Sequence, residues 1–140
     1  MGAELLLDTG ALVSLLDRSQ PRHVVCRRFF DEWTGVVVST EAVLTEATHL
    51  LAGVHGGVAS CVDFFVRGGA VLVPSTPTSL RRVRALLEKY ADLPMDFADG
   101  TLVALAEELD STSVFTTDRT DFSVYRAKGR RPFRVLPDHV

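Results

Sequence analysis

Four acidic residues lie at positions where an apolar or a neutral residue would be expected if they had no special role. They are Asp8, directly after an apolar run, Glu46, on the apolar stripe of an expected helix, Asp99, near a helix start, and Asp118, directly after a late expected strand. Burying one unpaired carboxylate is costly, and four that converge repel one another unless a cation holds them. Oxygen ligands without a sulfur or histidine cluster favour Mg²⁺ or Mn²⁺ over zinc. The pattern therefore predicts a divalent-metal site.

A divalent ion at such a site can support hydrolysis of a phosphodiester. It can hold the phosphate, lower the pKa of a bound water and stabilise the charge that develops on the phosphorus oxygens. In this hypothesis Asp8 and Asp99 are direct or water-mediated ligands, Asp118 completes the cage, and Glu46 orients or deprotonates the water. A structural role stays open for each residue. Glu46 could pair with an arginine, Asp99 could complement the helix dipole, and Asp118 could form a turn.

Short apolar segments alternate with amphipathic ones, which favours a mostly parallel sheet with helices on both faces. Strands are expected at residues 5–7, 36–38, 70–73, 114–116 and 133–136. Helices are expected at residues 10–16, 21–33, from about 40, 58–67, from about 78, and 96–109. Pro21 suits a first helical turn, and Thr78 or Ser79 can cap the fifth helix. Asp8 then lies at the carboxyl end of a strand, where open parallel sheets bind their ligands.

The third expected helix has the clearest pattern. Ser39 and Thr40 can cap it. Its apolar residues follow the i, i+1, i+4, i+7, i+8 spacing and are Val43, Leu44, Ala47, Leu50 and Leu51. Glu46 lies three residues after Val43 and four before Leu50, so it shares the inward face.

The bulk properties suit one compact domain that spans residues 1–140. The chain is 46% hydrophobic and 24% charged, which is enough to bury a core. No stretch approaches the roughly 20 apolar residues of a membrane-spanning helix, and the N-terminus lacks the basic region of a signal peptide. Cys26 and Cys61 show neither zinc-site nor disulfide-scaffold spacing. A reduced, cytoplasmic location without membrane contact is expected.

Positive charge is concentrated near the end of the chain. The formal net charge of −3 argues against indiscriminate nucleic-acid binding through net charge alone. Residues 119–134 nevertheless contain six basic side chains and one acid. Arg119 and Arg126 in this segment are candidates for contacts to phosphates. Ordinary solvated surface charge is the open alternative.

Four motifs follow one another in a fixed order. They are a strand ending in Asp8-Thr9, Ser39 followed seven residues later by Glu46, Pro94-Met95-Asp96-Phe97-Ala98-Asp99 at a helix start, and Thr116-Thr117-Asp118-Arg119-Thr120-Asp121-Phe122. The ordered set resembles the PIN-domain ribonucleases, and among them the VapC-type toxins of toxin–antitoxin pairs. No single motif is specific, but the set covers essentially the whole chain, including the closing Phe133-Arg134-Val135-Leu136-Pro137.

The resemblance implies a three-layer α/β/α sandwich with a mostly parallel central sheet. It implies a Mg²⁺- or Mn²⁺-dependent endoribonuclease whose RNA products carry 5′-phosphate and 3′-hydroxyl ends. The acidic quartet carries over as Asp8, Glu46, Asp99 and Asp118. Thr116 is a hydroxyl beside the quartet, and Asp96 is the rival of Asp99 for the third place. Gly100 departs from the family, which usually has alanine there, and should loosen the helix start by up to ~1 kcal/mol.

The resemblance also implies a homodimer and a cognate antitoxin protein that inhibits the nuclease. An arginine of that partner could pair with the acidic cluster. Its flanking apolar residues could occupy a groove formed by early helices, near Leu15, Leu16, Phe29 and Phe30. The RNA substrate could contact Arg119 and Arg126 of the basic segment.

Other functions remain open. Asp8-Thr9-Gly10 also resembles the Asp-Thr-Gly motif of aspartic proteases, although those enzymes are rich in β-structure and this chain has mostly helical periodicity. Phosphotransfer domains also begin with a strand and an aspartate, but the lysine that they need after a later strand is missing. A catalytically weak PIN-like module that only binds RNA or protein is the remaining alternative.

Overall fold

The computed structural model describes residues 4–93 and 95–138 and contains a sheet of five parallel strands. In chain order they are β1 (Leu5–Leu7), β2 (Val37–Ser39), β3 (Val71–Leu72), β4 (Ser113–Phe115) and β7 (Arg134–Leu136). In space they stand in the order β3-β2-β1-β4-β7, and every neighbouring pair is parallel. Central strand β1 places Leu5 opposite Val37 on one side and Ser113 on the other.

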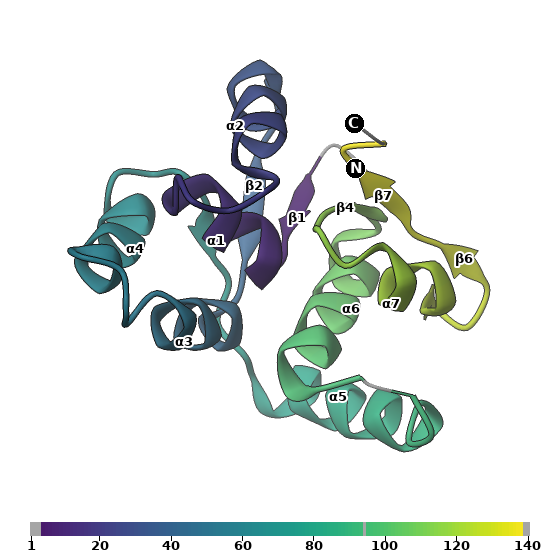
Figure 1. The fold of residues 1–140 in the computed structure, drawn as a ribbon. Helices are drawn as coiled ribbons and strands as arrows, with labels where there is room; N and C mark the ends of the chain where they lie inside the picture. The colour runs from purple at the N-terminus through teal and green to yellow at the C-terminus, as the bar shows by residue number, and fades with distance from the viewer. Residues whose placement is uncertain (1–3, 94, 139–140) are drawn as a thin grey trace.

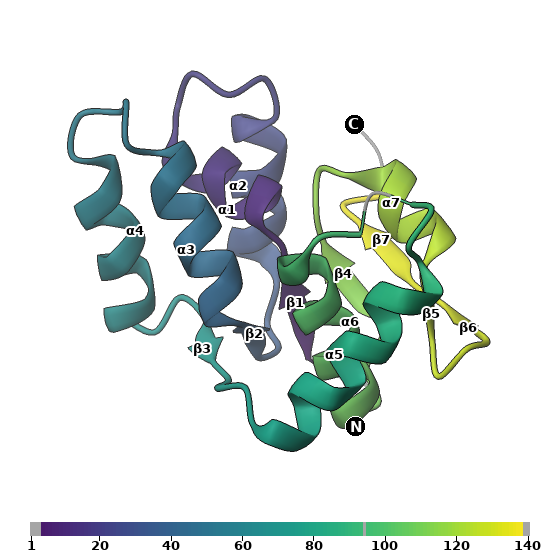
Figure 2. The same cartoon turned by 90° about the horizontal axis from the view of Figure 1, so that it is seen from below.

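Helices cover both faces of this sheet (Figures 1 and 2). Those in the described residues are α1 (Thr9–Leu16), α2 (His23–Glu32), α3 (Glu41–Leu50), α4 (Gly57–Val66), α5 (Pro77–Lys89), α6 (Phe97–Leu109) and α7 (Arg119–Val124). Helices α1 to α4 connect β1, β2 and β3 and pack together, whereas α5 to α7 lie along the route to β4 and β7. Because parallel crossovers are right-handed, the reversal at β1 of the order in which strands are added moves the later helices to the opposite face. The predicted three-layer sandwich is confirmed.

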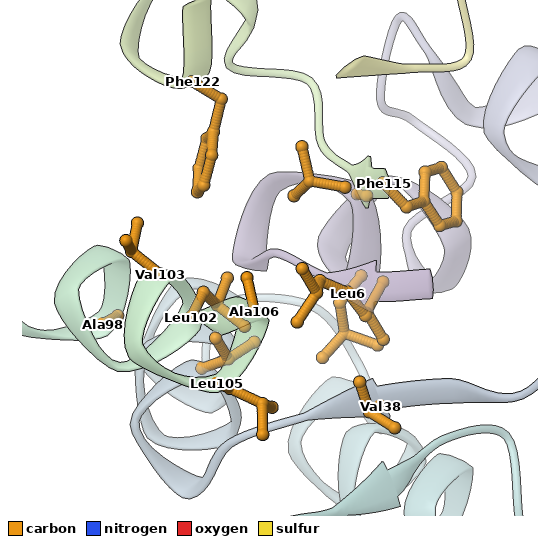
Figure 3. Packing of buried hydrophobic residues seen from close by; sticks show 14 of the residues in the cluster. Leu6, Val38, Ala98, Leu102, Val103, Leu105, Ala106, Phe115 and Phe122 are labelled. Carbon is orange, nitrogen blue, oxygen red and sulfur yellow. The ribbon is translucent and has the colours of Figure 1, made fainter. Parts of the chain in front are cut away.

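The core lies on both faces of the sheet, and α6 packs against the centre of one of them. All three residues of β1 are fully buried, which explains why this strand is a continuous apolar run and does not alternate. Leu102 and Ala106 of α6 face Leu6 of the sheet in Figure 3. Phe115 of β4 lies on the other face, where its ring centroid is 4.9 Å from that of Phe29 in α2.

Side-chain caps fix where several helices begin. The predicted cap at Thr40 is confirmed, since its hydroxyl accepts a hydrogen bond from Val43 N. The prediction of Thr78 or Ser79 as a cap is wrong, because α5 begins earlier. Thr76 caps it, Pro77 is its first residue, and the Ser79 hydroxyl accepts a hydrogen bond from Thr76 N at 2.8 Å. Proline suits this place because the first helical N–H has no partner within the helix.

Other boundaries differ more modestly from the prediction. The helix expected to open at Pro21 begins at His23, and Pro21 lies in the preceding turn. Strands expected at residues 36–38 and 114–116 occupy residues 37–39 and 113–115. Leu50, expected on the inward stripe of α3, is 57% exposed, whereas Leu51 is fully buried.

The end of the chain contains elements that the hydrophobic pattern did not predict. Helix α7 follows β4, and β5 (Arg126–Ala127) pairs antiparallel with β6 (Arg131–Pro132). Glu107 of α6 holds this hairpin in place, because it accepts a hydrogen bond from Lys128 N at 2.6 Å. The same carboxylate binds Arg82 of α5 through two hydrogen bonds of 2.7 and 2.9 Å. One partly buried acid therefore joins two helices and the hairpin.

Gly100 allows α5 and α6 to approach closely. It is buried in α6, and a Cβ atom at this position would lie 3.0 Å from Cγ1 of Val83 in α5. The departure from alanine thus has a packing reason. Within the described residues, no helix combines the length and apolar character that crossing a membrane requires.

Candidate active site

The acidic residues meet at the carboxyl ends of β1 and β4. Asp8 directly follows β1, and its backbone N donates to Phe115 O of β4 at 3.0 Å. Thr116 directly follows β4. The sheet order reverses at β1, so the helices diverge above this edge and leave a crevice, which is where open α/β sheets bind their ligands. The view in Figure 2 looks onto the starts of α1, α6 and α7 around this edge.

A cavity of about 260 Å³ opens between these segments. Its ten lining residues include six acids, and none is basic. The acids are Asp8, Glu46, Asp96, Asp99, Asp118 and Asp121. All four residues of the predicted quartet are thus brought to one site, together with the rival Asp96. The remaining lining residues are Thr9, Gly10, Leu50 and Thr117.

Three of the carboxylates accept a hydrogen bond from a neutral hydroxyl group. The pairs are Thr116 to Asp8 at 2.6 Å, Thr9 to Glu46 at 2.5 Å, and Tyr125 to Asp99 at 2.9 Å. A hydroxyl orients a carboxylate without cancelling its charge, whereas an arginine or lysine would neutralise it. These hydroxyl groups therefore orient the acids without bringing a positive charge into the site.

Burial and mutual repulsion favour the protonated forms of these acids. Asp8 is only 6% exposed, and this burial raises its pKa to about 6 against the opposing hydrogen bond from Thr116. Burial, with the charges of Asp8 and Asp96, raises the pKa of Asp99 to about 8. The pKa of Glu46 is also raised, mainly by burial. Such an arrangement costs free energy in the empty protein and is relieved by a bound cation.

Two acids of the cavity also cap helices. Asp96 caps α6 and accepts a hydrogen bond from Asp99 N at 2.8 Å. Asp118 caps α7 and accepts from Asp121 N at 3.1 Å. Its own N donates to the Thr116 hydroxyl at 2.9 Å. Thr116 therefore ties the segments of Asp8 and Asp118 together, which fits its predicted supporting place.

Sequence reasoning missed two members of the site. Asp121 lines the cavity, and burial together with a hydrogen bond to Asp118 raises its pKa to about 6. Its position three residues after Asp118, on the short helix α7, could have been found by treating Asp118 as a helix cap. Thr9 was noted as part of a motif, but its bond to Glu46 joins residues 37 apart and has no local signal.

Gly10 allows the loop after β4 to pack closely against the start of α1. A Cβ atom at this position would collide with Oγ1 of Thr117 from the loop after β4. Asp8-Thr9-Gly10 is the cap and first two residues of helix α1 on a parallel sheet. The aspartic-protease alternative is wrong, since it requires a β-rich fold.

The two arginines proposed to contact RNA have bonds within the protein. Arg119 donates through Nη1 to Pro137 O at 2.7 Å. Arg126 donates through Nη1 to three backbone carbonyls at the end of α7, those of Ser123, Val124 and Tyr125. Both side chains therefore stabilise the C-terminal segment, and RNA contact by either stays a prediction.

The donor set fits a hard divalent cation. Carboxylate and hydroxyl oxygens surround the cavity, and these are the ligands that Mg²⁺ and Mn²⁺ prefer. In residues 4–93 and 95–138, no three His, Cys, Asp or Glu side chains are already gathered closely enough to form a metal cage. The acids stand around the space, and their raised pKa values mark the repulsion that a cation would relieve.

The fold is that of a PIN domain. The PIN domain family matches residues 5–128, and the chain belongs to that family. Among curated proteins, the chain is 28% identical over 137 residues to ribonuclease VapC26 of Mycobacterium tuberculosis (strain ATCC 25618 / H37Rv). The match covers 95% of this chain and all of that protein.

Solved structures share the fold. VapC20 of Mycobacterium tuberculosis, described as a toxin that cleaves the sarcin-ricin loop, has a TM-score of 0.77 at 18% identity, covering 83% of this chain and 91% of that one. A toxin–antitoxin complex from Klebsiella pneumoniae has a TM-score of 0.68 at 16% identity, covering 96% and 98%. VapBC2 from Rickettsia felis, bound to a fragment of its promoter DNA, has a TM-score of 0.66 at 12% identity, covering 94% and 98%.

Proposed function

We propose that this protein is a Mg²⁺- or Mn²⁺-dependent endoribonuclease and the toxin of a toxin–antitoxin pair. The observation that carries the proposal is the cavity at the ends of β1 and β4, in which six acids and no basic residue line the wall. Membership of the PIN family and the likeness to ribonuclease VapC26 support the reaction class. Residues 1–140 form, in this proposal, one PIN-like domain that acts in the cytoplasm.

Each acid has its own role in this proposal, according to its position in the cavity. Asp8, Asp99 and Asp118 hold the divalent ion, and Asp96 remains the alternative to Asp99. When bound, the ion supplies positive charge that binds the phosphodiester and stabilises its transition state. Glu46, fixed by Thr9 and with a raised pKa, orients or deprotonates the attacking water. Attack by water leaves 5′-phosphate and 3′-hydroxyl ends on the RNA.

Protein partners would contact two surfaces, one at the amino ends of β2 and β3 and one beside the acids. A cavity of about 670 Å³, lined by Phe30 and Trp33 at the end of α2 and by Phe64 of α4, could receive apolar residues of an antitoxin. A partner arginine could pair with the acids and displace the metal. We also propose a homodimer, for which half-exposed Phe97 and Leu50 beside the acids offer apolar surface.

Cleavage of RNA by the purified protein tests the enzyme. With Mn²⁺ the wild type should cut RNA, and EDTA should stop the reaction. Glu46→Gln should abolish cleavage while the protein stays folded, because a glutamine oxygen still accepts the hydrogen bond from Thr9. Glu41→Gln is the matched control, since Glu41 lies exposed in the first turn of the same helix and does not line the cavity. If Glu46→Gln cuts RNA as fast as wild type, this role of Glu46 is wrong.

Growth of the host tests the toxin role. Expression of the wild type alone should arrest growth, and Asp8→Asn should not. Co-expression of a small gene adjacent to this one should restore growth. A wild type that cuts RNA in vitro but is harmless in cells would instead indicate a housekeeping PIN nuclease. Metal-independent RNA binding without cleavage would favour the module that only binds.

A further inference from the structure

Tyr125 is held rigidly beside the acidic site. It directly follows α7, and its side chain is fully buried. Its ring packs edge-on against Tyr90 and Phe122, with centroid distances of 5.2 Å in both pairs. Aromatic packing from two neighbours fixes the ring and therefore the direction of its hydroxyl. That hydroxyl donates to Oδ2 of Asp99 at 2.9 Å.

Asp99 lies among like charges, and the hydrogen bond from Tyr125 opposes their effect. Asp8 and Asp96 both act on it as like charges, and each would turn its carboxylate away. The tyrosine engages Oδ2 and so leaves Oδ1 as the oxygen available in the cavity. A cationic side chain in this place would hold Asp99 equally well but would compete with a metal ion for its charge. A hydroxyl orients the carboxyl group without placing a competing positive charge beside it.

We propose that Tyr125 is a positioning residue that sets the orientation of Asp99 for a divalent cation. This inference rests on the proposed function, because it takes Asp99 as a ligand of the ion. Groups that orient metal ligands from behind contribute strongly to affinity, and their removal weakens metal binding by about 10- to 100-fold. The contact also links the site to α7, since Tyr125 ends that helix.

Tyr125→Phe removes this hydroxyl and keeps the ring that packs in the core. Tyr90→Phe is the matched control, because the Tyr90 hydroxyl accepts a hydrogen bond from Arg126 N at 3.0 Å and touches no acid. Isothermal titration of the metal-free proteins with Mn²⁺ should show about a 10-fold weaker Kd for Tyr125→Phe and an unchanged Kd for Tyr90→Phe. A merely structural hydroxyl would lower the apo unfolding midpoint in both variants and leave both Kd values at that of wild type.

Tight Mn²⁺ binding by both wild type and Tyr125→Phe overturns the role of Tyr125 and leaves the proposed function intact. A wild type that binds no Mn²⁺ overturns both. In an Asp99→Asn background, Tyr125→Phe should have no further effect on Kd, since the hydroxyl acts through Asp99. A further loss in that background contradicts the proposal.

The wild type itself gives a second readout that does not depend on the folding of a variant. The chain has two tyrosines, so ¹³C labelling at the phenol carbon yields one signal for Tyr125 and one for Tyr90. Saturating Mg²⁺ should shift the Tyr125 signal, because the charge on its acceptor changes, and leave Tyr90 as the internal reference. Two unshifted signals at saturation overturn the proposal.

Discussion

Replacing Asp8 by asparagine separates the cost of burying a charge from the use of that charge in metal binding. Asp8 is buried and its pKa is raised from 3.8 to about 6. Between these values the folded protein keeps a proton that the unfolded chain loses, so the stability of the metal-free wild type falls as the pH rises through this window. Asparagine carries no charge and can still accept the hydrogen bond from Thr116. Asp8→Asn should therefore stabilise the metal-free protein at high pH.

The size of the effect follows from the two pKa values. The full cost of ionised Asp8 is about 3 kcal/mol above pH 7, at about 1.4 kcal/mol per pKa unit. At pH 4 Asp8 of the folded protein is mostly protonated, so the free-energy cost falls to about 0.5 kcal/mol. The asparagine amide also has to find a partner, so about 1–3 kcal/mol is expected at pH 8. In a domain of this size that is roughly 4–12 °C in Tm.

Thermal denaturation in EDTA at pH 4 and pH 8 measures this difference, and the same scans with Mg²⁺ or Mn²⁺ measure the metal effect. At 100 times Kd, a ligand stabilises the native state by about 2.7 kcal/mol. The wild type should show this gain at pH 8, and Asp8→Asn should lose most of it. The variant would then be the more stable protein without metal and lose that advantage when metal is added.

Asp17→Asn is the control for the direction of the change in stability. Asp17 is also a buried acid, but hydrogen bonds from Gln20 and Ser19 lower its pKa. An acid of that kind stabilises the fold above its unfolded pKa and loses this effect as the pH falls, so Asp17→Asn should lower the Tm at pH 8. The reasoning is refuted if Asp8→Asn is less stable than wild type at pH 8 in EDTA, or if its advantage is the same at both pH values.

Three further substitutions test packing and hydrogen bonds, each by the free energy of unfolding in urea. Gly100→Ala should destabilise by about 1 kcal/mol, because the contact with buried Val83 outweighs the helix propensity gained, whereas Gly53→Ala, in open space, should cause no loss. Glu107→Ala should cost about 2 kcal/mol by freeing the hairpin and one arginine; an unchanged value would mean that the hairpin is held elsewhere. Arg126→Ala should cost about 1 kcal/mol through its lost carbonyl contacts, and weaker RNA binding without any loss of stability would instead support the RNA-contact prediction.

The main layers of the fold were predictable because buried parallel strands carry a strong local signal. Leu5–Leu7 is apolar throughout since both faces of β1 are covered. The ends of helices were less predictable where two neighbouring residues could each serve as the N-cap. Thr76 and Thr78 are both good caps, and only the position of Pro77 as a first helical residue decides between them. Leu50 fits the helical stripe, but it lies at the acidic cavity and is exposed, while Leu51 beside it is buried.

The acids of the site were predictable one at a time, because each breaks a local pattern. Their hydroxyl partners were not, since they join distant parts of the chain. Thr116 and Asp8 are 108 residues apart, and Tyr125 and Asp99 are 26 apart. The hairpin at residues 126–132 also has no hydrophobic alternation of its own, because tertiary bonds from Glu107 hold its turn. Such contacts appear only when the whole chain is folded.

The pairing of β4 with β7 has a consequence for the order of events during protein synthesis. Thr116, which holds Asp8, donates its own N–H to Leu136 O at 3.1 Å, and β4 lies between β1 and β7. The strand next to the acids therefore gains its second neighbour only after residues 134–136 have been synthesised. A growing chain carries Asp8 and Glu46 early but cannot complete the β4 edge of the acidic pocket until β7 is available, more than 85 residues after Glu46.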